Sequence, residues 1–418
     1  MNRFRHDLTV FLLLVSALIF SSCGGETAGG AGRTNSSNDV AYAVATDARG
    51  NVYVAGYTDG SFEGNPSAGN ADLLLIKYDS GGFRQWARQL GTGWVDRALG
   101  VAADNMGSVY LAGHTYYNPL DLGSTNRNLL LIKFDSDGTA IWDRIMVTSG
   151  DTGANGVATD NSGNVYVVGY TYDSLDGNPN AGMSDLFILK FSGGGNLLWS
   201  RQLGTTGYDE AQGVSVDNAG NIYVAGFTSG GLDGNPNAGG YDFFIIKYDT
   251  GGNRIWTRQF GTQQGDFANG VATDDNGNVF VTGYTYGGMD GNVSAGERDI
   301  FLVKYDGSGN RIWTRQIGSP SVDYASSVAT DGVNIYVGGQ TFGDLDGNRN
   351  MGVADLVLVK YDNMGNKQWT RQAGGGNNDL ASGVAADRTG NVYAAGETGI
   401  GMNDTDVLLI KYDSAGNR

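Results

Sequence analysis

The chain has 418 residues, including 69 glycines and only 5 prolines, and its formal charge is −17 at pH 7. Abundant glycine together with 40% apolar residues is typical of many short strands joined by tight turns. The negative charge repels phosphate backbones and therefore argues against nucleic-acid binding. A single cysteine excludes an intramolecular disulfide, so the apolar core must supply the stability.

The N-terminal segment has the pattern of a signal peptide. Two arginines precede an apolar stretch of 13 residues, Leu8 to Phe20, which is too short to cross a bilayer. Two serines stand directly before Cys23, and this resembles a bacterial lipoprotein cleavage and acylation site. We therefore expect a lipoprotein-type signal peptide over residues 1–22, then a lipidated cysteine and flexible tether over 23–38. That places the protein at the bacterial cell envelope, on the outer membrane or cell surface; the alternative is an ordinary secreted protein.

The rest of the sequence consists of seven copies of one unit of about 57 residues. A repeat of this length indicates a propeller or a solenoid before any single motif is considered. The copies begin, at steps of 56 or 57 residues, at Asp39, Asp96, Thr152, Asp209, Asp266, Asp323 and Asp379.

Each unit predicts four strands, which the fifth copy illustrates with segments 270–274, 279–285, 300–305 and 311–316. Turns rich in Asp, Gly and Asn separate the first segment from the second and the third from the fourth, as in antiparallel hairpins. The third segment is apolar on both strand faces, which indicates burial on both sides. Four antiparallel strands form a propeller blade, whereas solenoid coils are parallel. We therefore expect an all-β, seven-bladed β-propeller over residues 39–418.

The unit also resembles a known bacterial repeat. It reads approximately Asp-x-Ala, then Val-x-x-Asp, then Gly-Asn-x-Tyr-Val-x-Gly-x-Thr, and this pattern resembles the SBBP family of β-propeller repeats. The resemblance covers residues 39–418 and implies a seven-bladed propeller. It implies little about function, because one fold supports many functions.

Several residue types recur once per unit. One tryptophan in each fourth strand is expected to pack between neighbouring blades: Trp86, Trp142, Trp199, Trp256, Trp313 and Trp369. Each third strand has a lysine near its end, and each tryptophan is followed two residues later by an arginine. We expect these basic residues to form ion pairs with the Asp residues at the ends of most first strands. Such regularity favours a structural role over a catalytic one.

The loop between the second and third strands is acidic, and in copies three to six it reads Leu/Met-Asp-Gly-Asn. These loops are expected to share one face of the disc with the connections between blades. Carboxylate and amide oxygens are ligands that Ca²⁺ prefers, so possible Ca²⁺ ligands are Asp176, Asp233, Asp290, Asp344, Asp346 and Asn348. The competing interpretation is that these side chains cap their own turns, with Gly at positive φ.

Two irregular residues are candidate ligand contacts. Trp94 lies in a connection where other copies carry Gly, Thr or Tyr, and His114 stands where most copies carry an aromatic residue. His114 is the only histidine outside the first 22 residues, and the sequence has no nucleophile elbow, phosphate loop or zinc spacing. An enzyme is therefore disfavoured, although acid–base catalysis by paired carboxylates stays open.

The seventh copy contains no fourth-strand segment before the sequence ends at Asn417-Arg418. Its third strand, Val407–Lys411, is then an open apolar edge. Three explanations compete: the blade tolerates three strands, the sequence is a piece of a longer chain, or a partner supplies a strand.

These observations predict a non-catalytic binding or scaffold module, anchored to the membrane only through its lipid. A protein or glycan partner is expected to meet the acidic loop face. The alternatives are an envelope enzyme that acts on polysaccharide through carboxylates, and a structural spacer in a surface assembly.

Overall fold

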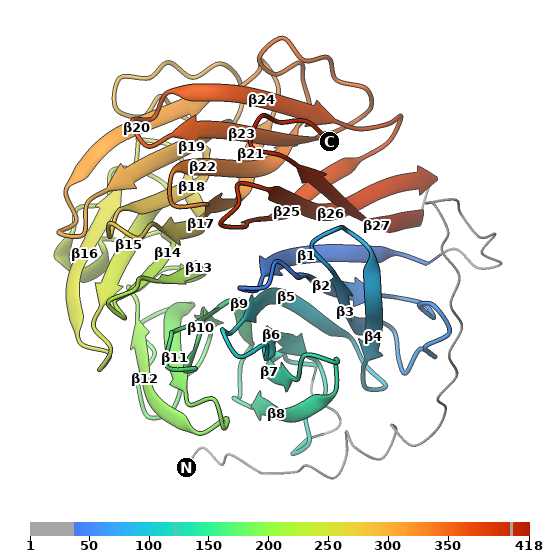
Figure 1. Ribbon diagram of the computed structural model, residues 1–418. Coiled ribbons are helices and arrows are strands. Elements are labelled where there is room, and N and C mark those ends of the chain that lie inside the picture. The colour runs from blue at the N-terminus through green and yellow to red at the C-terminus, as the bar shows by residue number, and fades with distance from the viewer. Residues whose placement is uncertain (1–36, 122, 124, 402–403) are drawn as a thin grey trace.

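The computed structural model describes residues 37–121, 123, 125–401 and 404–418. In these residues, strands β1 to β27 form seven antiparallel sheets arranged in a ring (Figure 1). Six sheets have four strands and the last has three, which confirms the predicted seven-bladed propeller. The predicted signal peptide, Cys23 and the tether up to residue 36 lie outside the described residues. No helix in the described part of the chain is long and apolar enough to span a bilayer.

Each blade takes its strands in chain order, from the axis outward. Blade one contains β1 (Asp39–Thr46), β2 (Val52–Thr58), β3 (Asp72–Tyr78) and β4 (Arg84–Leu90). Blade two contains β5 (Asp96–Ala103), β6 (Val109–Thr115), β7 (Asn128–Phe134) and β8 (Ala140–Met146). Blade three contains β9 (Thr152–Thr159), β10 (Val165–Thr171), β11 (Asp185–Phe191) and β12 (Leu197–Leu203).

Blade four contains β13 (Asp209–Val216), β14 (Ile222–Thr228), a short 3₁₀ turn η2 (Leu232–Gly234), β15 (Asp242–Tyr248) and β16 (Arg254–Phe260). Blade five contains β17 (Asp266–Thr273), β18 (Val279–Thr285), β19 (Asp299–Tyr305) and β20 (Arg311–Ile317). Blade six contains β21 (Asp323–Thr330), β22 (Asn334–Thr341), β23 (Asp355–Asp362) and β24 (Lys367–Ala373). Blade seven contains β25 (Asp379–Ala386), β26 (Val392–Gly401) and β27 (Asp404–Tyr412).

The core lies between the blades, because each middle strand is covered on both faces by neighbouring sheets. Every residue of β10 and β11 is buried, as the continuous apolar pattern predicts. Across one such boundary, Phe243 of blade four stacks on Phe301 of blade five with ring centroids 5.0 Å apart. Side chains of this size contribute about 2 kcal/mol each when fully buried, so the boundaries supply most of the apolar stabilisation.

The first strands surround an axial channel of about 450 Å³. A β-bulge recurs in this strand in every blade, for example between Ala268 and Gly270 of β17, and it bends the strand. Small residues let the strands approach each other closely. A Cβ added at Gly270 would lie only 3.0 Å from the backbone nitrogen of Val328 in the next blade.

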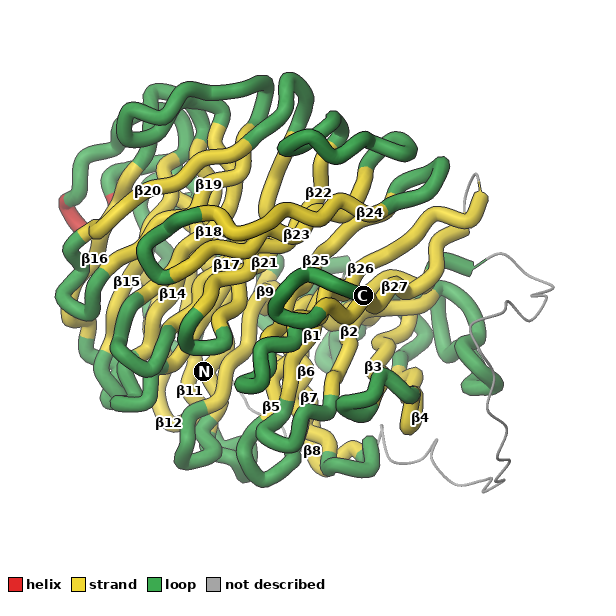
Figure 2. Tube along the Cα trace, turned by 45° about the horizontal axis from the view of Figure 1, so that its top comes forward, coloured by secondary structure: helices red, strands yellow, loops and turns green. Residues whose placement is uncertain are grey.

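The connections lie at the two ends of the strands, as the green segments of Figure 2 show. One end carries the long loops between second and third strands together with the connections from blade to blade, and we call it the loop face. The opposite end carries the tight turns between first and second strands and between third and fourth strands, and we call it the turn face. The strand order therefore gives the predicted arrangement.

Candidate binding surface on the loop face

The tryptophan, lysine and arginine ladders join each blade to the next. The indole of Trp86 and the ammonium of Lys77 both donate to the carbonyl oxygen of Ser136 in the next blade, at 3.3 and 2.9 Å. Arg88 donates to the Gly138 carbonyl in the same turn at 3.0 Å and lies over the Trp86 ring. The tryptophan therefore packs between blades as expected. The expected ion pairs are wrong for the lysine and arginine ladders, whose acceptors here are backbone carbonyls.

The aspartates at the ends of the first strands hold their own turns instead. One oxygen of Asp47 accepts from the backbone N–H groups of Arg49 and Asn51, both at 2.9 Å. Its other oxygen accepts from the Asn51 amide at 2.7 Å. Such local hydrogen bonds are typical of Asp at turn starts, so this ladder is structural.

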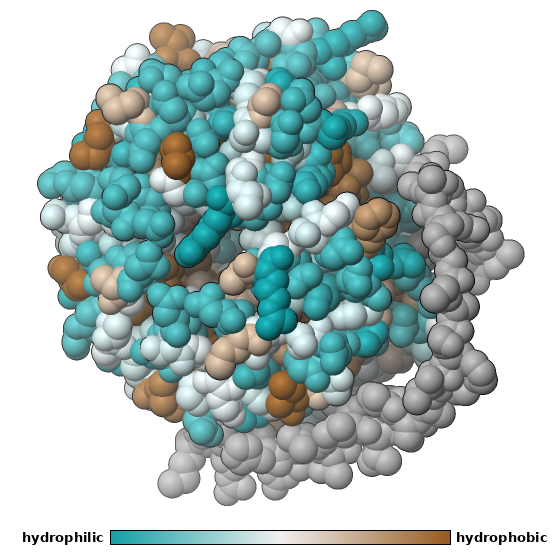
Figure 3. All heavy atoms as spheres, viewed as in Figure 1, coloured by the Kyte–Doolittle hydropathy of each residue, from teal (hydrophilic) through white to brown (hydrophobic). Residues whose placement is uncertain are grey.

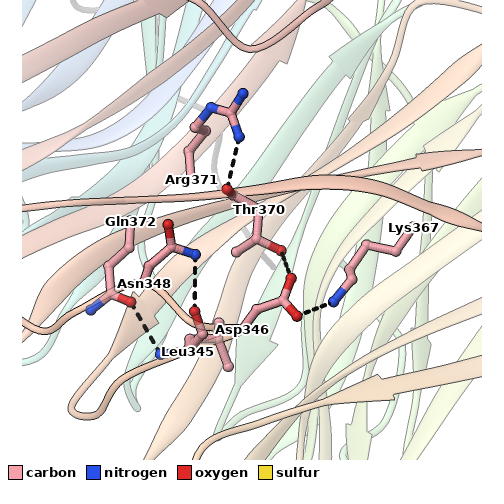
Figure 4. Close-up of polar contacts among 7 residues, drawn as sticks. All are labelled: Leu345, Asp346, Asn348, Lys367, Thr370, Arg371 and Gln372. Carbon is pink, nitrogen blue, oxygen red and sulfur yellow. Dashed lines mark hydrogen bonds and ion pairs between the residues drawn. The ribbon is translucent and has the colours of Figure 1, made fainter.

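The acidic loops pair with their own fourth strands, as Figure 4 shows for blade six. Asp346 forms an ion pair with Lys367 and accepts from the Thr370 hydroxyl at 2.7 Å. Burial acts to raise the pKa of Asp346, but the hydrogen bonds from Lys367 and Thr370 outweigh it and lower that pKa. Asn348 donates to the Leu345 carbonyl at 3.0 Å, which closes the turn.

The other candidate Ca²⁺ ligands have comparable partners. Asp233 pairs with Arg254, Asp290 pairs with Arg311, Asp176 accepts from the Ser200 hydroxyl, and Asp344 accepts from the Asn350 N–H. No group of three or more His, Cys, Asp or Glu that could hold a metal occurs in the described part of the chain. Binding of Ca²⁺ at these loops stays a prediction, and at three of them it would have to displace a basic side chain.

Trp94 and His114 occupy different environments. Trp94 lies on the connection from β4 to β5 with 38% of its surface exposed. His114 of β6 is buried and packs edge-on against Tyr116, with ring centroids 5.9 Å apart. Burial lowers the pKa of His114 to about 4, and the charges of Arg127 and Arg97 add to the effect. The imidazole is therefore neutral at pH 7.

His114 belongs to a larger set of side chains that sequence reasoning missed. The position it occupies in the second strand lies opposite the second residue of the first strand, and both positions are near the loop face. We use the name aromatic rim for the aromatic and charged side chains at or beside these positions in blades one to six: Tyr57, Arg97, His114, Tyr116, Arg127, Tyr170, Tyr172, Glu210, Phe227, Tyr241, Phe267, Tyr284, Tyr286, Arg298 and Tyr324.

The rim is a continuous aromatic cluster over blades four to six. Phe267 stacks on Tyr284 at 4.9 Å between centroids and lies 5.0 Å from Tyr241. Tyr284 then contacts Tyr286 at 6.0 Å and Tyr324 of the next blade at 5.8 Å. These five rings are all partly exposed. Such a cluster offers rigid apolar area together with phenolic hydroxyls.

Charged residues of the rim contact aromatic rings both within this cluster and in blades two and three. The Arg298 guanidinium lies over the Tyr286 ring at 4.9 Å. Arg127 donates to the hydroxyls of Tyr116 and Tyr170 at 3.1 and 2.6 Å. Burial raises the pKa of Glu210 to about 6, although the charge of Arg127 opposes that shift.

Variation between copies is the signal that could have identified the rim. The seven positions equivalent to His114 hold Tyr57, His114, Tyr170, Phe227, Tyr284, Gln340 and Glu397. Neighbouring positions such as the Gly before and the Thr after are the same in all seven copies. The fold therefore does not dictate the rim residue, whereas it does dictate its neighbours.

An enzyme that uses carboxylates would be expected to have a close pair of them. Close carboxylate pairs do occur, but they are fully buried beneath the blade-to-blade connections. A Cβ added at Gly261 would lie 2.2 Å from a carboxylate oxygen of Asp242 and 2.9 Å from one of Asp266. Both aspartates are 0% exposed. Asp242 accepts from the Ala238 N–H, and Asp266 accepts from the Thr262 N–H. These pairs therefore hold the loops in place.

Equivalent pairs recur at four other boundaries, where one carboxylate acts electrostatically on the other or both lie beside one glycine: Asp72 with Asp96, Asp185 with Asp209, Asp299 with Asp323, and Asp355 with Asp379. Between blades two and three, Asn128 and Thr152 replace both carboxylates. A site used for catalysis would be expected once rather than at five boundaries, so the pairs are structural.

The rest of the described surface has fewer features that suggest contact with a ligand. The face drawn in Figure 3 is mostly hydrophilic, with hydrophobic residues scattered singly. Single exposed apolar residues are normal on soluble proteins. Among the described residues, the aromatic rim is therefore the strongest candidate for ligand contact.

Comparison with protein-family models identifies the SBBP beta-propeller repeat at residues 30–63, 145–176, 198–233, 255–288, 312–346 and 368–401. The structure adds the blade between the first two matches, β5 to β8. The chain is therefore built of SBBP beta-propeller repeats, as its resemblance implied.

Two curated proteins are similar in sequence. Regulatory protein FlaEY of Caulobacter vibrioides is 31% identical over 186 residues, which cover 40% of this chain and 19% of that protein. An uncharacterized WD repeat-containing protein of Acanthamoeba polyphaga mimivirus is 24% identical over 397 residues, which cover 70% of this chain and 29% of that protein. The chain thus spans less than a third of the length of either relative.

Solved structures share the fold at low sequence identity. Hydrazine synthase of Kuenenia stuttgartiensis has a TM-score of 0.51 and 12% identity, covering 92% of this chain and 99% of that one. A mutant puromycin hydrolase has a TM-score of 0.52 and 14% identity, covering 91% of this chain and 53% of that one. These similarities concern the fold alone.

Proposed function

Because the chain is a closed ring of SBBP beta-propeller repeats, we propose that it is a non-catalytic binding or scaffold module whose aromatic rim contacts a partner protein. The propeller fold and its regulatory and WD-repeat relatives support a binding or scaffold role. The observation that carries the proposal is the rim itself, in which aromatic residues contact one another at and beside positions where the seven copies differ.

The chemistry of the rim matches that of protein interfaces. Tyrosine and arginine are enriched where binding energy concentrates, because they combine apolar area with hydrogen-bonding groups. In the blade-five part of the rim, Arg298 lies over Tyr284 and Tyr286 at 5.4 and 4.9 Å. The chain as a whole is strongly acidic, so a partner with basic groups around an apolar centre would associate fastest.

The test compares two double variants of the purified chain. Tyr286→Ala with Arg298→Ala removes the edge of the aromatic cluster, and Ile255→Ala with Ile312→Ala removes two exposed side chains from outer strands as the matched control. Envelope proteins captured by the wild type are identified and their affinities measured. We expect the rim variant to lose about tenfold or more in affinity and the control variant to bind as the wild type does.

Three results would count against this proposal. If the captured partners bind the rim variant and the wild type with equal affinity, the interface does not include the rim. Binding to polysaccharides on a glycan array, lost in the rim variant, would assign the rim to a glycan instead. Cleavage of such a polysaccharide would favour the alternative carboxylate enzyme.

We also propose that the domain acts at the bacterial envelope through a lipid on Cys23. The support is the leader pattern of residues 1–22, which lie outside the described residues. Metabolic labelling with a fatty-acid analogue should label the wild type and leave Cys23→Ser unlabelled. Equal labelling of both proteins would reject the anchor.

A further inference from the structure

Each first strand contributes its bulged residue to the wall of the axial channel. The bulge leaves this residue without a partner in the second strand, as for Asn269 between Ala268 and Gly270. Bulges re-aim a side chain relative to the regular alternation of a strand. In all seven blades the residue at this position borders the channel.

The identity of the bulged residue varies between copies, although its surroundings do not. The residue before it is alanine in all seven copies, and the residue two positions after it is valine in all seven. The bulged residue is Asn or Gln in blades three to five and Ser in blades six and seven, but it is Tyr42 in blade one and Leu99 in blade two. The fold therefore does not dictate this side chain.

The asparagines on the channel wall are held in place by the next blade. Asn155 donates to the Ala211 carbonyl at 2.9 Å, and Asn269 donates to the Ala325 carbonyl at 2.7 Å. Gln212 lies on the blade between them. Each asparagine amide keeps its oxygen and a second N–H, and no donor in the described part of the chain bonds to either oxygen. A ligand in the channel would therefore meet acceptors and donors whose positions are already fixed.

An aromatic ring lies across the channel from these amides. The blades follow one another around the ring in chain order, so Tyr42 of blade one lies opposite blades four and five (Figure 1). Its ring packs against Tyr57, with centroids 5.7 Å apart. Among the described residues that line the channel, none is Asp, Glu, Lys, Arg or His. An uncharged wall disfavours an ionic ligand, because a charge buried there would have no partner.

We propose that the axial channel is a binding site for a neutral mono- or disaccharide. A sugar ring has an apolar C–H face that fits an aromatic side chain, and its hydroxyls both donate and accept, as the amides require. The channel volume of about 450 Å³ falls within the range of about 300–1,000 Å³ that is usual for small-molecule sites. This site is separate from the aromatic rim and does not depend on a protein partner there.

The experiment uses the whole 418-residue chain and saturation-transfer NMR. The probes are glucose, galactose, N-acetylglucosamine, cellobiose, lactose and chitobiose, alongside charged counterparts that carry a carboxylate or an ammonium group. We expect at least one neutral sugar to bind with a dissociation constant of about 1 mM or lower. Its charged counterparts should bind about tenfold or more weakly.

Variants that borrow residues from other copies locate the bound sugar without introducing a side chain that the fold has not accepted. Asn155→Ser with Asn269→Ser removes both fixed amides, and Tyr42→Leu removes the aromatic ring. We expect each to weaken sugar binding about tenfold or more. The matched control is Asn105→Ser, which removes a bond between neighbouring blades, to Asn161 at 3.0 Å on the turn face, and should bind as the wild type does.

The rim variant, Tyr286→Ala with Arg298→Ala, separates this site from the proposed protein interface. It should bind the sugar as the wild type does, because neither residue lines the channel. Loss of sugar binding in this variant would place the sugar on the rim and overturn the channel site. So would no binding of any probe at about 10 mM, unchanged binding by the double asparagine variant, or equal binding of the charged counterparts. Capture of partner proteins is a separate measurement, so either proposal can fail without the other.

Discussion

At the residue scale, the contact between tryptophan and glycine explains why the turn between third and fourth strands needs glycine. A positive φ alone would tolerate Asn. The indole of the previous blade adds a second demand, because a Cβ at Gly309 would lie 2.9 Å from Trp256. The same glycine therefore serves the turn and the boundary at once.

This double role predicts different costs for one substitution at two positions. Gly82→Ala should cost about 1 kcal/mol, since only the positive φ opposes it. Gly138→Ala should cost about 2–4 kcal/mol, because its Cβ would also crowd Trp86 at 3.1 Å. Urea denaturation of the two variants measures the difference. Equal costs would show that the tryptophan contact does not constrain the glycine.

The buried aspartate pairs have a consequence for pH. Burial raises the pKa values of Asp96, Asp209, Asp266 and Asp323 above 3.8, hydrogen bonds oppose it, and the partner carboxylate of each pair adds to the rise. The folded protein thus holds protons that the unfolded chain has already released. Stability from these groups is complete below pH 3.8 and is lost as the pH rises through the folded values.

We therefore expect the free energy of unfolding to fall as the pH rises above 3.8, as long as these carboxyls release their protons. Aspartates with lowered pKa values, such as Asp160 and Asp387, act in the opposite direction, but their effect lies below pH 3.8. The single His114, whose pKa is lowered from 6.5 to about 4, opposes the fall between these two values, and the four aspartates outnumber it. Urea midpoints across this range measure the slope, and Asp266→Asn should make it shallower. A stability that rises steadily as the pH rises above 3.8 would contradict this assignment of protons.

At the element scale, the acidic loop is a turn closed by its own strand. Asp233 has φ +55° and Gly234 follows at +77°, and Arg254 of β16 pairs with the carboxylate. Both partners are about one third exposed, so such a pair is worth less than about 1 kcal/mol. Its effect is to neutralise the carboxylate that Ca²⁺ would need.

Calcium should therefore bind weakly to the wild type. We expect the melting temperature to differ by less than about 1 °C between millimolar Ca²⁺ and a chelator. Arg254→Ala removes the basic partner of Asp233. This variant is the comparison in which calcium would raise the melting temperature more than in the wild type. A rise in the wild type that the chelator reverses would instead support Ca²⁺ binding at the acidic loops.

The strands could be predicted from the sequence because the same unit recurs seven times. Periodic Asp-x-Ala starts and Gly-Asn turns indicated the strands, and a tryptophan in every complete copy indicated packing between blades. The rim was missed because its contacts cross blade boundaries, as when Phe267 of blade five meets Phe227 of blade four at 5.0 Å. Strand patterns describe neighbours within one sheet and carry no information on the facing blade.

The acceptors of the lysine and arginine ladders were missed for a related reason. Charge complementarity suggested aspartate partners, and the sequence contains many. Instead, Lys133 and Arg144 donate to the backbone carbonyls of Gly193 and Gly195, which lie in a turn of the adjacent blade. A backbone carbonyl is the same for every residue type, so no side-chain pattern reveals it.

At the scale of the whole molecule, ring closure joins the first and last blades without a shared sheet. The two innermost strands at the boundary, β1 and β25, are in contact, and Thr46 donates to the Ala386 carbonyl at 3.2 Å. In the outer part of the boundary, Lys411 donates to the Ser80 carbonyl at 2.9 Å. The cores of the first and last blades are continuous, since Tyr393 and Val54 belong to one cluster. Among the described residues, the contacts that close the ring are therefore concentrated near the axis.

Local opening should consequently begin at this boundary. Opening free energies vary across a protein with local packing and hydrogen bonding, and within the described residues this boundary lacks the tryptophan and arginine contacts of the other six. We expect the amides of β27 to exchange at least about tenfold faster than those of β19, the equivalent strand in a complete blade. Native-state hydrogen exchange at low denaturant measures both, and Lys411→Ala should accelerate β27 further while leaving β19 unchanged. Uniform exchange across the seven blades would mean that closure near the axis alone makes the ring one cooperative unit.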